Sequence, residues 1–257
     1  MADDWTGRDL ADEATGSLRD KAPDTLGVPD PTAPVSGHRP APAGGGPAGG
    51  GAAAPEHDWE AARGLVYPIL RPAGTTGAAA DVPLDVLRSS PVSHTTPLVS
   101  DGPCGLVVSF VLQGGGFDVL VNAEHLVSWG VDADELAGAA GANLAAWSAE
   151  AGWTDEISGS RRILSSDTGD HDAARILLTE VRAHLASELA TSAVAGTRIL
   201  VGVPERHMLL AGTMTPGDEE FAVLFHGFVS EQSEAAEEPI DRRVLELVGG
   251  ELVEFAG

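Results

Sequence analysis

Two short polar segments contain the side chains best suited to chemistry. The first holds Asp167, Asp170, His171 and Asp172 close together. Carboxylates beside an imidazole could bind a divalent cation, but the spacing lacks the Gly and Glu positions of an EF-hand loop. The alternative is that an aspartate begins the helix expected after it, because a carboxylate is stabilised at a helix N-terminus. We expect the capping role, and therefore no metal and no cofactor.

The second segment is Glu205-Arg206-His207, at the tip of a predicted hairpin. A carboxylate, a guanidinium and an imidazole could bind an anion or transfer a proton. Adjacent residues of an extended chain point to opposite sides, so a shared site would need partners from elsewhere. The simpler interpretation is a solvated turn.

Two single residues also stand out. Cys104 is the only cysteine, which excludes a disulfide within the chain. A nucleophilic thiol needs a base, and His94 and His125 are neighbours only in sequence, so we expect a small buried side chain. Asn143 lies on the apolar stripe of a predicted helix, where its amide must find hydrogen-bond partners. We expect it to tie the helix to a neighbouring loop, with a ligand contact as the alternative.

Hydrophobic patterning predicts the elements that position these residues. Two apolar runs flank Gly114-Gly115-Gly116 and indicate a hairpin over 105–122. A helix over 132–148 should begin with a capping box of Asp132 and Glu135. A second helix over 170–190, with Arg175 on its solvent side, and a second hairpin over 198–212 should follow. Further expectations are strands at 65–71 (an edge strand, because of Pro68), 162–164, 221–229 and 252–255, loops at 72–97 and 231–238, and a short helix at 241–248. Together these elements predict an α+β fold, in which two amphipathic helices pack against a mostly antiparallel sheet.

Composition divides the chain and limits its partners. Residues 1–58 contain few bulky apolar side chains among Pro, Gly and Ala, which predicts a disordered acidic tail and linker before a single domain at 59–257. The formal net charge is −24 and Lys21 is the only lysine, so nucleic acid and anionic membranes are poor partners. The longest apolar run is too short to span a membrane, and the N-terminus lacks a secretory signal pattern. These features predict a cytoplasmic protein.

Several segments resemble the YtpQ-like family of bacterial proteins. The resemblance covers about residues 62–255, and its clearest matches are Tyr67-Pro-Ile-Leu-Arg71, Leu106-Val-Val-Ser-Phe-Val111, Asp172-Ala-Ala-Arg-Ile-Leu-Leu178 and Val201-Gly-Val-Pro-Glu-Arg-His207. Family members tend to show Asn-Arg-Asp where this chain has Glu205-Arg206-His207. The family has no assigned activity, so the resemblance implies no catalytic residues.

The sequence shows none of the common catalytic or nucleotide-binding motifs, such as GxSxG, HExxH or GxxxxGK[ST]. We therefore expect a non-catalytic protein-interaction or regulatory module with a flexible N-terminal arm, its partner an unknown protein or a second copy. The alternative is an enzyme or small-molecule-binding protein with a dispersed site near the 165–172 loop and the 204–207 turn. The residues to test would be Asn143, Asp170, His171, Glu205, Arg206 and His207.

Overall fold

The computed structural model describes residues 54–90, 94–114, 117–191 and 193–257. The predicted tail and linker therefore lie outside the described residues, apart from positions 54–58. Those few residues contact the domain: the Pro55 carbonyl accepts the Trp129 indole N–H at 2.8 Å. The Asp58 side chain caps the short helix α2 (Trp59–Ala62). The folded part thus includes residues that the sequence assigned to the linker.

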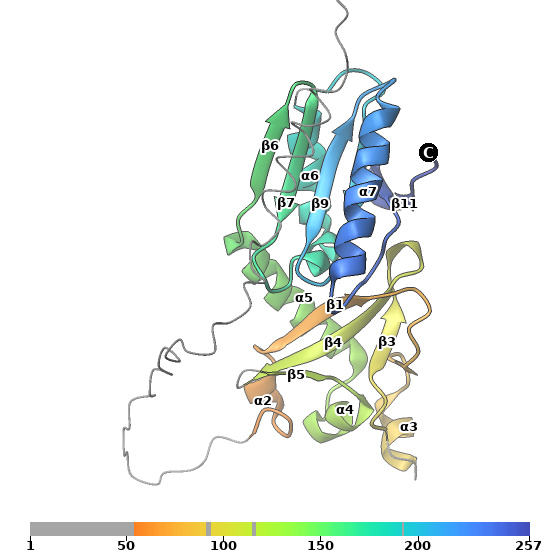
Figure 1. The fold of residues 1–257 in the computed structure, drawn as a ribbon. Helices are drawn as coiled ribbons and strands as arrows, with labels where there is room; N and C mark the ends of the chain where they lie inside the picture. Colours follow the sequence, from red (N-terminus) through yellow and green to blue (C-terminus); the bar gives the residue numbers. More distant parts are fainter. Residues whose placement is uncertain (1–53, 91–93, 115–116, 192) are drawn as a thin grey trace, which may run out of the picture. The chain divides into compact units, whose positions relative to one another are not determined.

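The fold is α+β, as predicted, but it contains two mostly antiparallel sheets (Figure 1). The first has the order β1-β4-β3-β2, and β5 also pairs with β4. Its strands are β1 (Val66–Arg71), β2 (Ala78–Ala79), β3 (Leu98–Asp101), β4 (Val107–Gly114) and β5 (Phe117–Leu120). The second has the order β11-β10-β8-β9-β7-β6. Its strands are β6 (Thr154–Ser158), β7 (Arg161–Ser166), β8 (Arg198–Gly202), β9 (Leu209–Met214), β10 (Leu245–Val248) and β11 (Glu251–Glu254).

The first sheet confirms the predicted β4–β5 hairpin and places β1 at an edge, as Pro68 indicated. Three helices accompany it: α3 (Leu84–Ser89), α4 (Ala123–Trp129) and α5 (Ala133–Glu150). Asp132 caps α5 as expected, but the Glu135 carboxylate accepts the Trp59 indole N–H at 2.8 Å and does not complete a capping box. Helix α3 lies within the predicted 72–97 loop. Helix α4 was not predicted, because Asn122 and His125 form its capping box and do not match the usual pattern.

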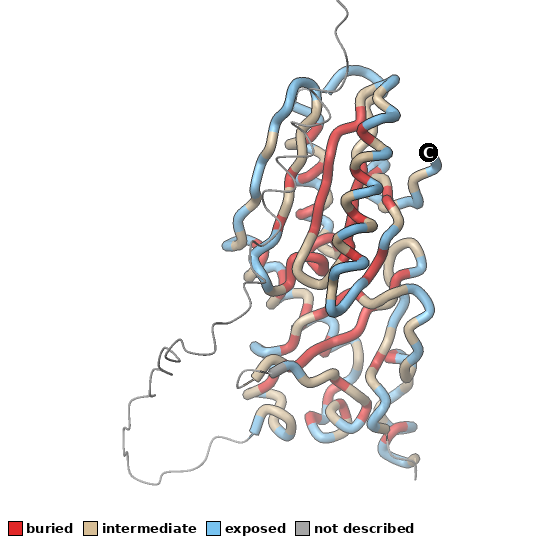
Figure 2. The backbone as a smooth tube through the Cα atoms, in the orientation of Figure 1, coloured by how far each residue is buried: buried red, intermediate tan, exposed pale blue. Residues whose placement is uncertain are grey.

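The second sheet is covered by one helix on each face (Figure 1). Leu164, Val201 and Leu209 pack in one core with the buried face of α6 (Thr179–Ala190). Leu200, Leu210 and Met214 pack on the other side with α7 (Glu219–Ala235). Strand β9 is therefore buried along its whole length (Figure 2). Glycine at 212 permits this close approach, since an added Cβ would lie 2.8 Å from the Phe221 ring.

Three predictions in the C-terminal third were wrong. Residues 221–229 form part of α7 and not a strand, because the buried Phe221, Phe225 and Val229 recur every fourth residue. Helix α7 continues to Ala235, so the predicted 231–238 loop begins later. The residues predicted to form a helix at 241–248 include strand β10 instead. The closing strand, β11, is confirmed.

The predicted helix at 170–190 is interrupted. A 3-10 turn, η2 (Ala173–Leu177), precedes α6, and Leu178 between them is extended, with φ −77° and ψ 126°. Because the two pieces do not share one axis, Arg175 does not face solvent as predicted and is only 1% exposed. Strand β6 was not predicted, and β7 extends beyond the expected 162–164.

Candidate functional site

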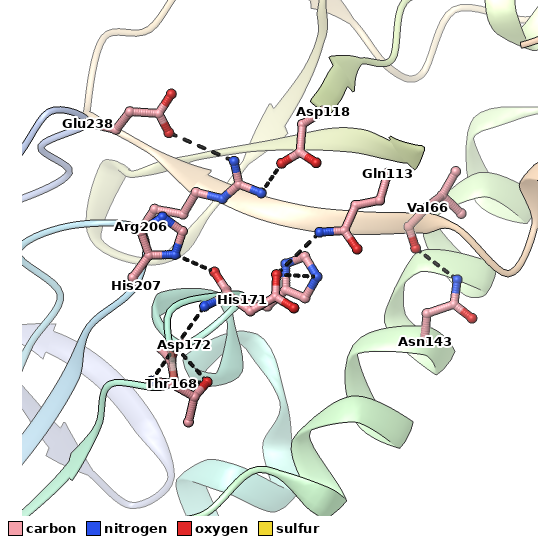
Figure 3. Close-up of polar contacts among 11 residues, drawn as sticks. Val66, Gln113, Asp118, Asn143, Thr168, His171, Asp172, Arg206, His207 and Glu238 are labelled. Carbon is pink, nitrogen blue, oxygen red and sulfur yellow. Dashed lines mark hydrogen bonds and ion pairs between the residues drawn. The ribbon is translucent and has the colours of Figure 1, made fainter. Parts of the chain in front are cut away.

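The two polar segments meet where the two sheets adjoin (Figure 3). The 167–172 loop follows β7, the 204–208 turn joins β8 to β9, and Ser166 is paired with Leu209 on the neighbouring strand. The loop and the turn are linked directly, because Asp170 and His207 share a hydrogen bond of 2.8 Å. We call the polar residues at this place the junction cluster: Gln113, Asp118, Asp170, His171, Arg206 and His207.

The first sheet contributes two members of the junction cluster. Gln113 at the end of β4 donates its amide N–H to Asp170 Oδ1 at 3.2 Å. Asp118 of β5 forms an ion pair with the Arg206 guanidinium, which also lies 3.9 Å from a Glu238 carboxylate oxygen. The Arg206 side chain is only 15% exposed, so the predicted solvated turn is wrong for this residue. These contacts connect the 204–208 turn of the second sheet to strands β4 and β5 of the first sheet.

His207 has a defined orientation. Its Nδ1 lies 2.8 Å from the Asp170 carbonyl oxygen, which can only accept a hydrogen bond. Nδ1 therefore carries the proton in the neutral ring, and Nε2 is the proton acceptor. Burial raises the pKa of both Asp167 and Glu205, and the charge of His207 opposes that rise at each carboxyl. The structure thus places the His207 imidazole in the same region as Asp167 and Glu205, two carboxyl groups whose pKa values are raised by burial.

Neither aspartate caps a helix: Asp170, which the sequence predicted as the cap of the second helix, does not, and neither does Asp172. Asp172 is fully buried and makes no capping hydrogen bond at the start of η2. Its carboxylate accepts the Thr168 N–H and hydroxyl, each at 3.0 Å, and the Ser166 hydroxyl. Ser166 Oγ in turn accepts an Arg175 N–H at 2.5 Å, so the hydroxyl bridges two buried charges.

Arg175 was missed by the sequence interpretation. Its guanidinium donates to Ser148 Oγ at 3.0 Å and to the carbonyls of Ser148, Ala151 and Gly152 at 3.1–3.3 Å. It also lies over the Trp153 ring, 4.0 Å from the centroid. Arg175 therefore ties η2 to the C-terminal end of α5, a structural role that leaves no donor for substrate.

His171 differs from its neighbours. Its side chain is fully buried, stacked on Tyr67 with centroids 4.0 Å apart and touched edge-on by Trp147 at 5.3 Å. Neither ring nitrogen forms a hydrogen bond of regular geometry, although Nε2 lies 3.2 Å from Asp170 Oδ1. Burial lowers the pKa of His171, while the Asp170 charge acts the other way. Burial thus favours the neutral form of the ring, which is held among aromatic side chains.

Asn143 and Cys104 lie outside the junction cluster. Asn143 Nδ2 donates to the Arg63 carbonyl and to the Val66 carbonyl, each at 2.8 Å, and so ties α5 to the start of β1; Figure 3 shows the contact with Val66. This confirms the predicted helix tie. Cys104 is half-buried, its Sγ donates to the Leu252 carbonyl at 3.4 Å, and burial raises its pKa. A raised pKa disfavours the thiolate that a nucleophile requires.

Within the described ranges, no group of three or more His, Cys, Asp or Glu side chains is arranged to hold a metal ion. None of the helices in that part of the chain is long and apolar enough to cross a membrane. No family model, curated protein or solved structure matches the chain. The resemblance to the YtpQ-like family therefore stays a prediction.

Proposed function

We propose that the chain is a non-catalytic protein-interaction module. The observation that carries this proposal is that most side chains with catalytic potential are engaged in contacts within the domain. Arg206 is paired with Asp118, Asp172 with hydroxyls and backbone N–H groups, and Asn143 with two carbonyls. A nucleophile and its base need free polar atoms directed at a substrate, whereas the principal polar groups of these residues are used within the domain.

The charge of the surface favours a basic partner. Seven arginines in the described part form ion pairs with carboxylates of the same chain: Arg63, Arg161, Arg162, Arg198, Arg206, Arg242 and Arg243. Because the formal net charge is −24, the remaining carboxylates dominate the outer surface. Such a surface attracts cationic partners and repels a second copy of the same chain.

We place the contact at the open edge of β6. Among the described strands, β6 pairs with β7 alone, and four of its five residues are exposed. Ile157 on this strand is 70% exposed and follows Glu156, while Asp155, two residues before it, is paired with Arg162. An added strand gains backbone hydrogen bonds at such an edge. The opposite edge, β11, is less open because the Leu252 carbonyl accepts the Cys104 thiol.

A second copy is a poor occupant of this edge. Antiparallel pairing of two β6 strands about Glu156 would place the two Glu156 side chains directly opposite each other. Like charges in that position are destabilising. An extended segment with an apolar residue beside Ile157 and with Lys or Arg side chains matches both the exposed strand edge and the acidic surface; the Asp155 carboxylate itself is already paired with Arg162.

The test uses a labelled synthetic peptide of alternating lysine and valine, with binding followed by fluorescence anisotropy. We expect saturable binding that weakens as salt is added, since exposed charges are screened. Ile157→Lys should abolish most of the binding by adding a like charge beside the peptide. The matched control is Val253→Lys on β11, which makes the same change at the covered edge and should leave binding intact.

Two results would contradict the proposal. Equal losses in the Ile157 and Val253 variants would show that β6 is not the contact. A second peptide with proline in place of valine keeps the charge and removes alternate N–H donors. If it bound as well as the first, the attraction would be purely electrostatic and strand addition would be ruled out.

A further inference from the structure

His171 is a member of the junction cluster in which both side-chain nitrogens lack a hydrogen-bond partner, whereas in Arg206 only Nε does. A neutral imidazole has one N–H donor and one lone-pair acceptor. Both nitrogens are buried without a hydrogen-bond partner, and the side chain is 0% exposed. Stacking on Tyr67 and edge contact with Trp147 would be served equally by a phenyl ring. Packing therefore accounts for an aromatic side chain at this position and does not account for its nitrogens.

The surroundings of the ring favour a positively charged ligand. Carboxylates from three separate segments lie at or beside the cluster: Asp170 of the loop after β7 lies against the ring, and Asp118 of β5 and Glu238 after α7 lie beside Arg206 (Figure 3). Arg206 is the cation placed among them. Three carboxylates beside one guanidinium leave the cluster negative, so an anion would be repelled and a cation attracted.

Solvent can reach this cluster beside His171. The Asp170 side chain is 42% exposed and lies against the buried ring, with Oδ1 at 3.2 Å from Nε2. The Glu238 side chain is 56% exposed. Asp170 thus joins the surface to the imidazole, and a group that donates several hydrogen bonds could contact both. Ammonium and guanidinium groups are donors of this kind.

We propose that the junction cluster binds a small organic cation, an ammonium or guanidinium group, with Asp170 and His171 as its hydrogen-bond acceptors. Asp170 provides the opposite charge, and the lone pair of the His171 ring accepts a further N–H. Tyr67 holds the ring in place from β1. This site is separate from the β6 edge, so it stands or falls independently of the proposed protein partner.

The first test is a titration of the whole chain with butylamine, followed through the His171 ring signals in NMR. Butanol is the matched ligand, since it has the same length and no charge. Putrescine, agmatine and a lysine capped at both ends form further arms, and they distinguish a free amine, a guanidinium and a lysine side chain as the source. We expect saturable shifts of the His171 ring with at least one cation and none with butanol.

Two variants locate the site. His171→Phe keeps the stacked ring and removes the nitrogens, and Asp170→Asn removes the charge at nearly constant size. Each should weaken cation binding at least tenfold. Glu251→Gln on β11 removes an exposed carboxylate elsewhere and should change nothing. Tryptophan fluorescence provides a binding signal when His171 is absent.

Several results would overturn the proposal. Unchanged His171 signals with every cation would do so, as would equal shifts with butanol or unaltered affinity in the Asp170→Asn variant. If His171→Phe does not fold, the titration of the unmodified chain still decides the question. Binding of Mg²⁺ in place of the amines would identify a different class of site.

Discussion

Replacing Arg175 with methionine should strongly destabilise the fold. The guanidinium donates five hydrogen bonds of 2.5–3.3 Å, three of them to carbonyls at and just after the C-terminal end of α5. Methionine fills similar volume but leaves those acceptors and the buried Asp172 without a compensating positive charge. Breaking a buried charged network in this way costs about 3–5 kcal/mol. For a chain of this size the midpoint of thermal unfolding should fall by roughly 6–20 °C.

The assay is urea unfolding followed by circular dichroism, with Arg242→Met as the control. Arg242 pairs with Glu234 at 3.7 Å, and both side chains are more than 60% exposed, so its loss should cost at most about 1 kcal/mol. A double-mutant cycle with Asp172→Asn tests whether the uncompensated Asp172 charge causes the loss. In the Arg175→Met background, neutralising this carboxylate should restore part of the stability. An Arg175→Met protein as stable as the unmodified chain would refute this account, as would additive effects of the two changes.

Three further predictions concern pH and the domain boundary. Burial lowers the pKa of His171 below its ordinary 6.5, so the folded state takes up this proton less readily than the unfolded chain. Its contribution to stability is complete above about pH 6.5 and declines as the pH falls below it, and unfolding free energies of His171→Phe at several pH values should lack that decline. Burial raises the pKa of Asp167 and Glu205, so stability is lost as the pH rises through their titration; Asp167→Asn should raise the melting temperature at neutral pH and bring no gain under acid conditions. Deleting residues 1–53 should leave the melting temperature unchanged, whereas deleting 1–58 should lower it, because the second truncation also removes the Pro55 and Asp58 contacts.

The sequence predicted those parts of the fold that local patterns determine. The two apolar runs of the hairpin at 105–122, the Asp132 cap and the 198–212 hairpin are all contained within short segments. The strand predicted at 221–229 failed because an apolar run of that length fits either structure. A cap at Asp218, visible in the sequence, was the available signal for a helix.

The candidate site was predictable only in part. The sequence identified the loop and the turn, and the pairing of β7 with β9 brings them together. The contribution of Gln113, Asp118 and Tyr67 depends on how the two sheets meet, and no local pattern encodes that contact. Arg175 was misplaced for a similar reason, since no local pattern in the sequence marks the extended residue Leu178, at which the predicted helix is interrupted.

The single thiol offers a native reporter of local opening. Cys104 is anchored to the final strand through the Leu252 carbonyl, and Arg243 holds the Cys104 carbonyl at 3.0 Å from its guanidinium. Any fraying of β11 releases the sulfur before the rest of the second sheet separates. A change in the alkylation rate of this half-buried cysteine therefore reports a change in the opening of the C-terminal edge, without a substitution elsewhere in the chain.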